Sequence, residues 1–353
     1  MRVVAYAGEG RVRVESRERP APARGEVLLR LRCCGLCGTD LFKLANRSVF
    51  DGTVLGHELV GDVIEIGGGG SGGGGIGDGG VAVGDRVVVP HHVACGECAL
   101  CERGSETMCA RFRENLLDPG GFSELVLVRE RAAARALRRV PEGLSDDRAV
   151  FLEPAACVLR GVDRSGLLEV GVAVVIGGGS MGLLHVCVLR AVRPRVRVVI
   201  IEPLAARREL GLALGATIAC APDGAARAVR EESAELGADA VFDTVGGTRA
   251  LRSSLDLLRA GGTAVLFAHA PAGERADVEI NAFFKSERRV VPTYSGALAE
   301  QDRVWELLCD GSLDPAPLVS HRFALDEFDE AVRCVREHEG LKVLLEPRGA
   351  GAR

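Results

Sequence analysis

The sequence has few of the features that mark nucleic-acid-binding and membrane proteins. Its 44 lysine and arginine residues are set against 49 acidic residues, which gives a net charge of −5, and no basic stripe stands out. Lysine is scarce, since only Lys43, Lys285 and Lys342 are present, although this bias does not indicate a function. A chain without a basic surface is a poor candidate for binding nucleic acid or an anionic membrane. We therefore expect neither partner.

The sequence also lacks a long apolar segment of the kind that targets or anchors a protein. Residues 1–6 do not begin the apolar core of a signal peptide. Residues 171–189 carry no formal charge, but glycines at their centre would break a spanning helix, and a strand, a turn and a helix fit better. We expect a soluble, cytoplasmic protein whose twelve cysteines are free thiols or metal ligands rather than disulfides.

The 353 residues suffice for two domains of about 150 residues each. Residues 1–65 predict β structure, the glycine-rich segment that follows predicts a mobile surface loop, and a strand resumes at 83–89. From 171 to 294 strand patterns alternate with helical ones, which indicates a parallel sheet covered by helices. The predicted strands are 172–176, 196–201, 240–242 and 263–268, and the predicted helices are 204–214 and 225–235.

The C-terminal part predicts two more helices, at 303–308 and 325–336, and a strand at 342–345. We expect this last strand to rejoin the first domain. Residues 349–353 predict a disordered end. The fold class is therefore α/β, with a doubly wound parallel sheet and a separate β-rich domain.

Four of the twelve cysteines lie within 15 residues, namely Cys95, Cys98, Cys101 and Cys109. Four thiolates at this spacing can bind one Zn²⁺ tetrahedrally and leave no open coordination position. A metal bound in this way is structural and stabilises a lobe that lacks a core of its own. Two local disulfides, or a chance grouping, are the alternatives, and we favour the structural zinc.

A thiol, an imidazole and a carboxylate occur farther apart, at Cys37, His57 and Glu153. Taken singly, each has an ordinary structural explanation: a buried thiol, a hydrogen-bonded imidazole and a carboxylate at a helix start. Together they are the donor types of a catalytic zinc, which has three protein ligands and a water. This hypothesis requires three distant residues to meet around one ion.

Gly177, Gly179 and Gly182 form a G-x-G-x-x-G pattern that directly follows an apolar run and opens a helical stretch. Glu202 follows twenty residues later, at the end of a second strand, where an acidic side chain meets the ribose 2′-hydroxyl of a dinucleotide. The glycines let the backbone approach the pyrophosphate, which lies at the helix N-terminus. A glycine-rich turn in another α/β fold is the alternative.

The same segment indicates which dinucleotide would bind. Glu202 would repel a 2′-phosphate and so favours NAD over NADP, whereas Arg207 and Arg208 nearby keep NADP open. The candidate cofactor-binding residues are Gly177, Gly179, Met181, Gly182, Glu202 and Arg207.

These patterns together resemble the zinc-dependent medium-chain dehydrogenase family, in its sorbitol and threonine dehydrogenase-like branch, over nearly the whole chain. The resemblance is carried by Gly56-His57-Glu58, Cys37-Gly38-Thr39-Asp40, the four-cysteine lobe and the nucleotide fingerprint, in the family's order. It implies a GroES-like catalytic domain formed by residues 1–152 and 297–353, around a Rossmann domain at 153–296.

The resemblance implies a role for each matching residue. Cys37 and His57 match zinc ligands, and Glu153 stands where polyol and threonine dehydrogenases have a glutamate and alcohol dehydrogenases a cysteine. Glu58 matches a residue that lies against the metal and can exchange with its water. Thr39 matches the hydroxyl that takes the substrate proton.

The implied mechanism involves two further positions. Asp40 matches the partner that orients the metal-binding imidazole. Zinc lowers the pKa of the substrate hydroxyl, Thr39 relays its proton and the nicotinamide accepts hydride. Phe42 stands where many relatives have a histidine of the proton relay, so the proton must leave by another route. His92 resembles a histidine of threonine dehydrogenases, and it either contacts substrate or is an exposed loop imidazole.

The resemblance favours an NAD-dependent oxidoreductase with two zinc ions per chain. Its small-molecule substrate would be a secondary alcohol of polyol, sugar or cyclitol type, or the matching ketone, and its relatives imply a homodimer or homotetramer. L-threonine 3-dehydrogenase is the alternative suggested by His92 and Glu153, but no arginine committed to an amino-acid carboxylate can be identified. A non-catalytic NAD-binding relative is a second alternative. A zinc-free quinone reductase would not need the three dispersed ligands together.

Overall fold

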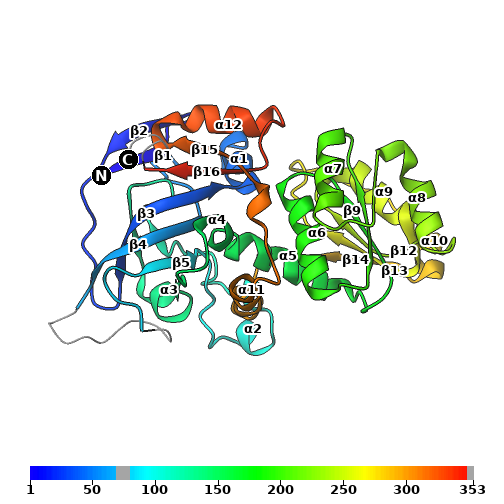
Figure 1. Ribbon diagram of the computed structural model, residues 1–353, viewed down its shortest axis with the longest axis horizontal. Coiled ribbons are helices and arrows are strands. Elements are labelled where there is room, and N and C mark those ends of the chain that lie inside the picture. The colour runs from blue at the N-terminus through cyan, green and yellow to red at the C-terminus, as the bar shows by residue number, and fades with distance from the viewer. Residues whose placement is uncertain (69–79, 348–353) are drawn as a thin grey trace. The chain divides into compact units, whose positions relative to one another are not determined.

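The computed structural model describes residues 1–68 and 80–347 of the chain. The described residues form two compact units (Figure 1). The first unit combines Met1–Glu153 and Ala297–Cys309 with the residues from Asp314 onward, and the second contains Pro154–Gly296 and Asp310–Leu313. The predictions for most of the glycine-rich loop at 67–80 and for the C-terminal end at 349–353 lie outside the described residues.

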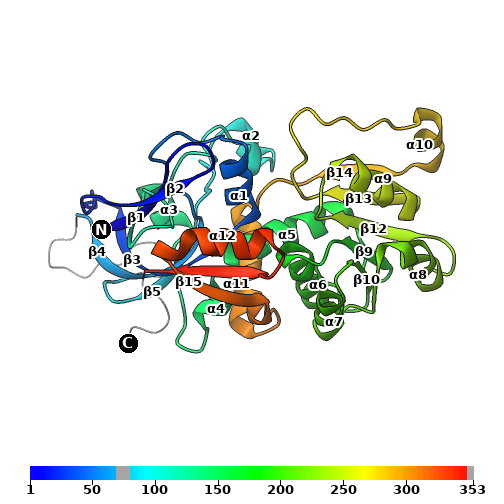
Figure 2. The ribbon, with the colours of Figure 1, turned by 90° about the horizontal axis from the view of Figure 1, so that it is seen from above.

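The first unit is built on a sheet with the strand order β15-β16-β3-β4-β5-β8, and β7 also pairs with β3. Its strands are β1 (Arg2–Tyr6), β2 (Val12–Ser16), β3 (Val27–Leu36), β4 (Glu58–Ile66), β5 (Arg86–Pro90), β6 (Leu117–Asp118), β7 (Leu125–Val128), β8 (Arg138–Arg139), β15 (Val319–Ala324) and β16 (Lys342–Glu346). Its helices are α1 (Gly38–Ala45), α2 (Ala99–Glu102), α3 (Glu130–Arg135), α4 (Asp146–Ala149), α11 (Leu298–Asp310) and α12 (Phe328–Arg336). Both views show α12 lying along β15 and β16 (Figures 1 and 2).

The pairing around β3 determines what lies at the centre of this unit. Gly35 of β3 is paired with Glu58 of β4 and, on its other side, with Leu344 of β16. A side chain at position 35 would place its Cβ 2.1 Å from Glu58 Oε2, so only glycine leaves room for that carboxylate. The antiparallel pairing of β16 with β3 confirms that the last strand rejoins the N-terminal sheet.

The second unit has a six-stranded parallel sheet with the order β11-β10-β9-β12-β13-β14. Numbered from its first strand, this order is 3-2-1-4-5-6, that of a doubly wound dinucleotide-binding fold. The strands are β9 (Val172–Ile176), β10 (Arg197–Ile201), β11 (Ile218–Cys220), β12 (Ala238–Asp243), β13 (Leu258–Leu266) and β14 (Arg289–Pro292). The helices are α5 (Leu152–Ser165, which begins in the first unit), α6 (Ser180–Val192), α7 (Ala205–Ala213), α8 (Ala225–Glu232), α9 (Gly247–Leu257) and α10 (Ile280–Ser286).

The predicted α/β fold class is confirmed, and the predicted elements are present with shifted ends. The strand expected at 172–176 is β9, and the uncharged run that contains it continues through a turn into α6. The helix expected at 225–235 ends earlier, at Glu232, because Ala234 and Glu235 adopt positive φ angles that a helix does not contain. Helix α1 and the short strands β11 and β14 were not predicted. In the described part of the chain, no helix is both long and apolar enough to span a membrane.

Candidate active site and metal centres

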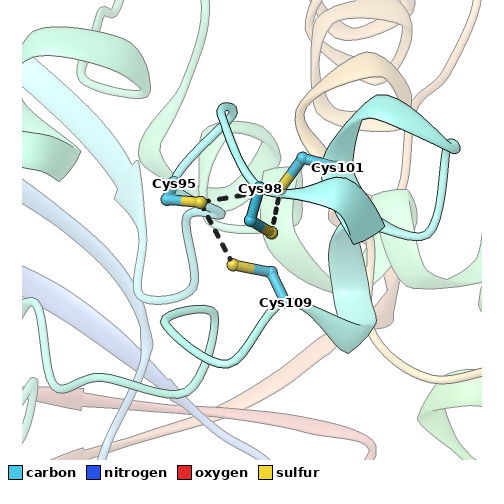
Figure 3. Close-up of side chains that lie close together, drawn as sticks. All are labelled: Cys95, Cys98, Cys101 and Cys109. Atoms are coloured by element: carbon cyan, nitrogen blue, oxygen red, sulfur yellow. Dashed lines mark hydrogen bonds between the residues drawn. The ribbon is translucent and has the colours of Figure 1, made fainter.

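Four cysteine thiols of the first unit lie close together around the short helix α2 (Figure 3). Their sulfur atoms are separated by 3.5 Å between Cys98 and Cys101, 3.5 Å between Cys109 and Cys95, and 3.8 Å between Cys95 and Cys101. Four sulfur ligands at the usual 2.3 Å from a tetrahedral zinc lie about 3.8 Å apart. All twelve cysteines are described and are free thiols, so disulfides do not account for the cluster. The donor set therefore fits a structural zinc.

The surroundings of the cluster affect its thiols differently and give the lobe little other support. Burial raises the pKa of the Cys101 thiol to about 11. Donation from the backbone N–H of Glu97 lowers the pKa of the Cys95 thiol to about 6. The apolar cluster around the lobe has only four buried members, Ala94, Cys101, Cys109 and Phe112. A metal would thus supply cohesion that so small a core cannot.

Cys37 lies at the point where β3 ends and α1 begins. Its sulfur accepts a hydrogen bond from the backbone N–H of Thr39 at 3.5 Å, and its own N–H donates to Asp40 Oδ2 at 3.1 Å. This reciprocal pair caps the helix, with a thiol in the place of the usual hydroxyl. Thr39, the second residue of α1, is half-buried beside Cys37.

His57 is oriented by a buried carboxylate behind it. Its Nδ1 lies 3.4 Å from Oδ1 of Asp40, a side chain with no exposed surface, and the N–H of Gly56 donates to the same oxygen. Burial raises the pKa of Asp40, but the attraction of His57 outweighs it and the pKa is lowered overall. Burial likewise lowers the pKa of His57, but Asp40 and Cys37 raise it well above its ordinary value. With Nδ1 occupied, Nε2 is the atom left for a metal.

The three predicted ligands of the reactive metal fall into two overlapping groups. Donor atoms of Cys37, His57 and Glu58 all lie within 4.8 Å of one another, and so do donor atoms of His57, His91 and Glu153. His57 belongs to both groups. The structure therefore brings Cys37 and Glu153 each close to His57, and it adds His91, which the sequence argument did not consider.

Glu58 has a partner that the sequence argument also missed. Lys342 Nζ lies 2.5 Å from Glu58 Oε2, and the two side chains are 2% and 0% exposed. Burial lowers the pKa of Lys342, but Glu58 and Cys37 outweigh it and the pKa is raised. The other oxygen, Glu58 Oε1, is buried without a hydrogen-bond partner among the described residues. A buried carboxylate oxygen left unpaired beside a thiol and an imidazole fits a metal site.

The nucleotide fingerprint lies where β9 passes into α6. Gly177 adopts a φ of +98°, and a Cβ on Gly182 would lie 1.9 Å from the Gly177 carbonyl oxygen, so both positions need glycine. Helix α6 begins after Gly179, which has no side chain to cap the first N–H groups of the helix. N–H groups at a helix N-terminus are suited to binding an anion, and Met181 lies in this first turn.

Glu202 lies directly after β10 and is tied to the fingerprint loop. One carboxylate oxygen accepts from the N–H of Gly178 at 2.6 Å and the other from the N–H of Leu204 at 2.8 Å. The guanidinium of Arg208 donates to the backbone carbonyls of Glu202 and Pro203. Arg207 is half-buried on α7.

Two family models match the chain: "Alcohol dehydrogenase GroES-like domain" over residues 23–139 and "Zinc-binding dehydrogenase" over residues 180–309. A 2-dehydro-3-deoxy-L-galactonate 5-dehydrogenase from Pseudoalteromonas atlantica is 30% identical over 348 residues, which are 97% of each chain. A sorbitol dehydrogenase from Halalkalibacterium halodurans is 28% identical, covering 96% of this chain and 97% of that one. The solved structure of a zinc-binding dehydrogenase from Sinorhizobium meliloti 1021, with bound NADP, superposes on this chain with a TM-score of 0.84. The two sequences are 28% identical, and the match covers 98% of this chain and 99% of that one.

The chain belongs to the zinc-dependent medium-chain dehydrogenase family. The first model falls within the first unit, which contains the metal-binding groups. The second covers the fingerprint helix α6 and most of the parallel sheet. The predicted family, with its GroES-like and Rossmann folds, is thereby confirmed, and the chain is an oxidoreductase.

Proposed function

We propose that this oxidoreductase transfers hydride between a secondary alcohol, of polyol, sugar or cyclitol type, and NAD, with zinc at its reactive centre. The observation that carries the proposal is the meeting of thiol, imidazole and carboxylate donors around His57, from residues as distant in the chain as Cys37 and Glu153. The names of the two relatives, a sorbitol dehydrogenase and a sugar-acid dehydrogenase, support the substrate class.

Cys37, His57 and Glu153 would hold the reactive zinc, and the four-cysteine lobe would hold a second, giving two per chain. Zinc bound at the reactive site would lower the pKa of a hydroxyl group beside it. Around that position the chain supplies fixed groups: Asp40 holds the His57 ring, and Lys342 holds one oxygen of Glu58. Oriented donors of this kind are already arranged when substrate arrives.

The proton of the alcohol is assigned to Thr39. The backbone N–H of Thr39 donates to the Cys37 sulfur, which supports this assignment because Cys37 is a proposed ligand of the metal. The hydroxyl accepts the substrate proton and passes it on, since a hydroxyl can both accept and donate. Phe42, one turn along the same helix, carries no group that could take the proton further, so its exit needs water or another residue.

NAD is favoured by the charge of Glu202. Two of its carboxylate lone pairs are used by backbone N–H groups, which leaves others for a ribose hydroxyl. A 2′-phosphate would meet this buried negative charge, and Arg208 is committed to backbone carbonyls. The NADP bound in the Sinorhizobium protein makes this choice a point to test rather than to assume. We also propose a homodimer or homotetramer.

The direct test is a screen for NAD⁺ reduction by polyols, cyclitols, sugar phosphates and L-threonine, each repeated with NADP⁺. We expect turnover with a secondary alcohol of the first three classes, and loss of that turnover in Cys37→Ser with NADH binding retained. Cys309→Ser, an exposed cysteine outside both metal-binding groups, is the matched control. Full turnover in Cys37→Ser would refute the proposed metal centre, and turnover with L-threonine alone would refute the substrate class.

A further inference from the structure

The strand register places a second histidine beside His57. In the antiparallel pair of β4 and β5, Glu58 is opposite Pro90 and Leu59 is opposite Val89. Continued by one residue, the same register sets His57 opposite His91. The two rings are accordingly close, with centroids 4.4 Å apart. The sequence alone could not reveal this, because it requires the register of strands about 30 residues apart.

One ring nitrogen of His91 lacks a hydrogen-bond partner among the described residues. This atom, Nδ1, is buried. Glu153 Oε1 lies 4.0 Å from this nitrogen, which is too far for a hydrogen bond. A buried imidazole nitrogen and a carboxylate oxygen that face each other without touching leave space for a cation between them.

The distances around that space suit a metal. Donor atoms of His57, His91 and Glu153 all lie within 4.8 Å of one another. Nitrogen and oxygen ligands of a tetrahedral zinc, at 2.0–2.1 Å, lie about 3.4 Å apart, so the donors need to approach one another by at most about 1.4 Å.

We propose that His91 is a fourth protein ligand of the reactive metal, alongside Cys37, His57 and Glu153. The inference rests on the proposed function, since it assumes a metal at His57. It differs from the three-ligand site expected from the sequence, in which the fourth position belongs to water or substrate. With His91 bound, a substrate oxygen must either displace a protein ligand or raise the coordination number to five.

His92 offers a matched control in the same segment. Its ring is tilted against that of His91, with centroids 3.6 Å apart, and it also contacts the ring of Phe112, with centroids 4.9 Å apart. Its Nδ1 is also buried without a partner among the described residues, yet no metal-binding group in that part of the chain includes it. His92→Phe keeps an aromatic ring in this position and removes only the nitrogens, as His91→Phe does next to the metal.

The experiment measures the metal itself. The zinc affinity of the reactive site is measured by competition with a chelator. In a second measurement Co²⁺ replaces zinc, and its visible absorption reports which ligands surround the metal. Cys37→Ser serves as the reference that separates the signal of this site from that of the four-cysteine lobe. His91→Phe is expected to weaken zinc binding by at least about 10-fold, the loss that even outer-shell changes cause. It should also shift the Co²⁺ d–d bands, while His92→Phe leaves both unchanged.

Each outcome decides one question. Unchanged affinity and bands in His91→Phe would overturn the inference and leave the proposed function intact. If the wild-type protein and Cys37→Ser show the same Co²⁺–thiolate absorption, no metal is bound by Cys37, and the proposed function itself is overturned. If His91→Phe does not fold, His91→Ala is titrated with free imidazole. Restored affinity supports ligation by His91, and no effect of imidazole contradicts it.

Discussion

The buried pair between Lys342 and Glu58 makes the sharpest prediction about stability. Lys342→Met keeps the unbranched stem of the lysine in β16 and removes its charge, which leaves the Glu58 carboxylate buried without its partner at 2.5 Å. Removing one member of a fully buried ion pair costs about 3–5 kcal/mol of unfolding free energy. We therefore expect Lys342→Met to lose that amount.

The assay follows urea unfolding through the single tryptophan, Trp305. Because Trp305 lies on α11 in the first unit, its fluorescence reports that unit and not the Rossmann unit. For a slope of about 3 kcal/mol per molar urea, the loss corresponds to a midpoint shift of roughly 1–2 M. Adding Glu58→Gln to Lys342→Met removes the unpaired charge and should recover most of the loss.

An exposed ion pair of the same unit is the control. Arg333 on α12 and Glu337, the residue that directly follows this helix, are 3.3 Å apart with side chains 59% and 52% exposed. Arg333→Met should cost no more than about 0.5 kcal/mol, as exposed helix pairs do. If Lys342→Met destabilises the unit no more than Arg333→Met, or if adding Glu58→Gln recovers nothing, the argument from the buried charge is wrong.

Three further predictions concern the fingerprint helix and the cysteine lobe. Burial lowers the pKa of His185 to about 4, so the neutral ring stabilises the fold fully above the ordinary pKa of 6.5 and this stabilisation is lost as the pH falls toward 4. Between pH 7.5 and pH 5 the free energy of unfolding of the wild-type protein should fall by about 2 kcal/mol. His185→Phe should remove this fall, as measured by unfolding followed with circular dichroism at each pH. If the unfolding free energies of the two proteins change in parallel with pH, the prediction is wrong. Gly182→Ala brings a Cβ within 1.9 Å of the Gly177 carbonyl, so NADH binding should be lost by calorimetry while the Trp305 signal is unchanged. Cys98→Ser should release one zinc and lower the yield of folded protein, and a normal yield with full zinc would argue against a structural metal.

What the sequence predicted correctly is mostly local. The four-cysteine cluster and the glycine fingerprint are contiguous patterns, so their chemistry can be recognised without knowing how distant segments meet. The strand expected at 172–176 coincides with β9, because a short, continuous apolar run rich in β-branched residues is typical of a parallel strand that is buried on both faces. The edge strands β11 and β14 are short and only half-buried, so their sequences show only a weak apolar pattern and they were not predicted.

What the sequence missed depends on contacts between distant segments. Lys342 and Glu58 are 284 residues apart, and they meet only because β16 and β4 both pair with β3. A scarce lysine directly before the apolar run at 343–345 was a signal that could have suggested a buried charge. His91 was overlooked beside His92, because which of the two rings faces the metal is determined by the register of β4 and β5.

The central claim is tested most directly by the zinc content of the purified protein and of Cys37→Ser, measured by atomic emission on folded samples. A reactive zinc at His57 predicts two zinc ions per wild-type chain and one in the variant, the remaining ion being held by the four cysteines. Equal zinc content in the two proteins would show that Cys37 binds no metal and would contradict the account.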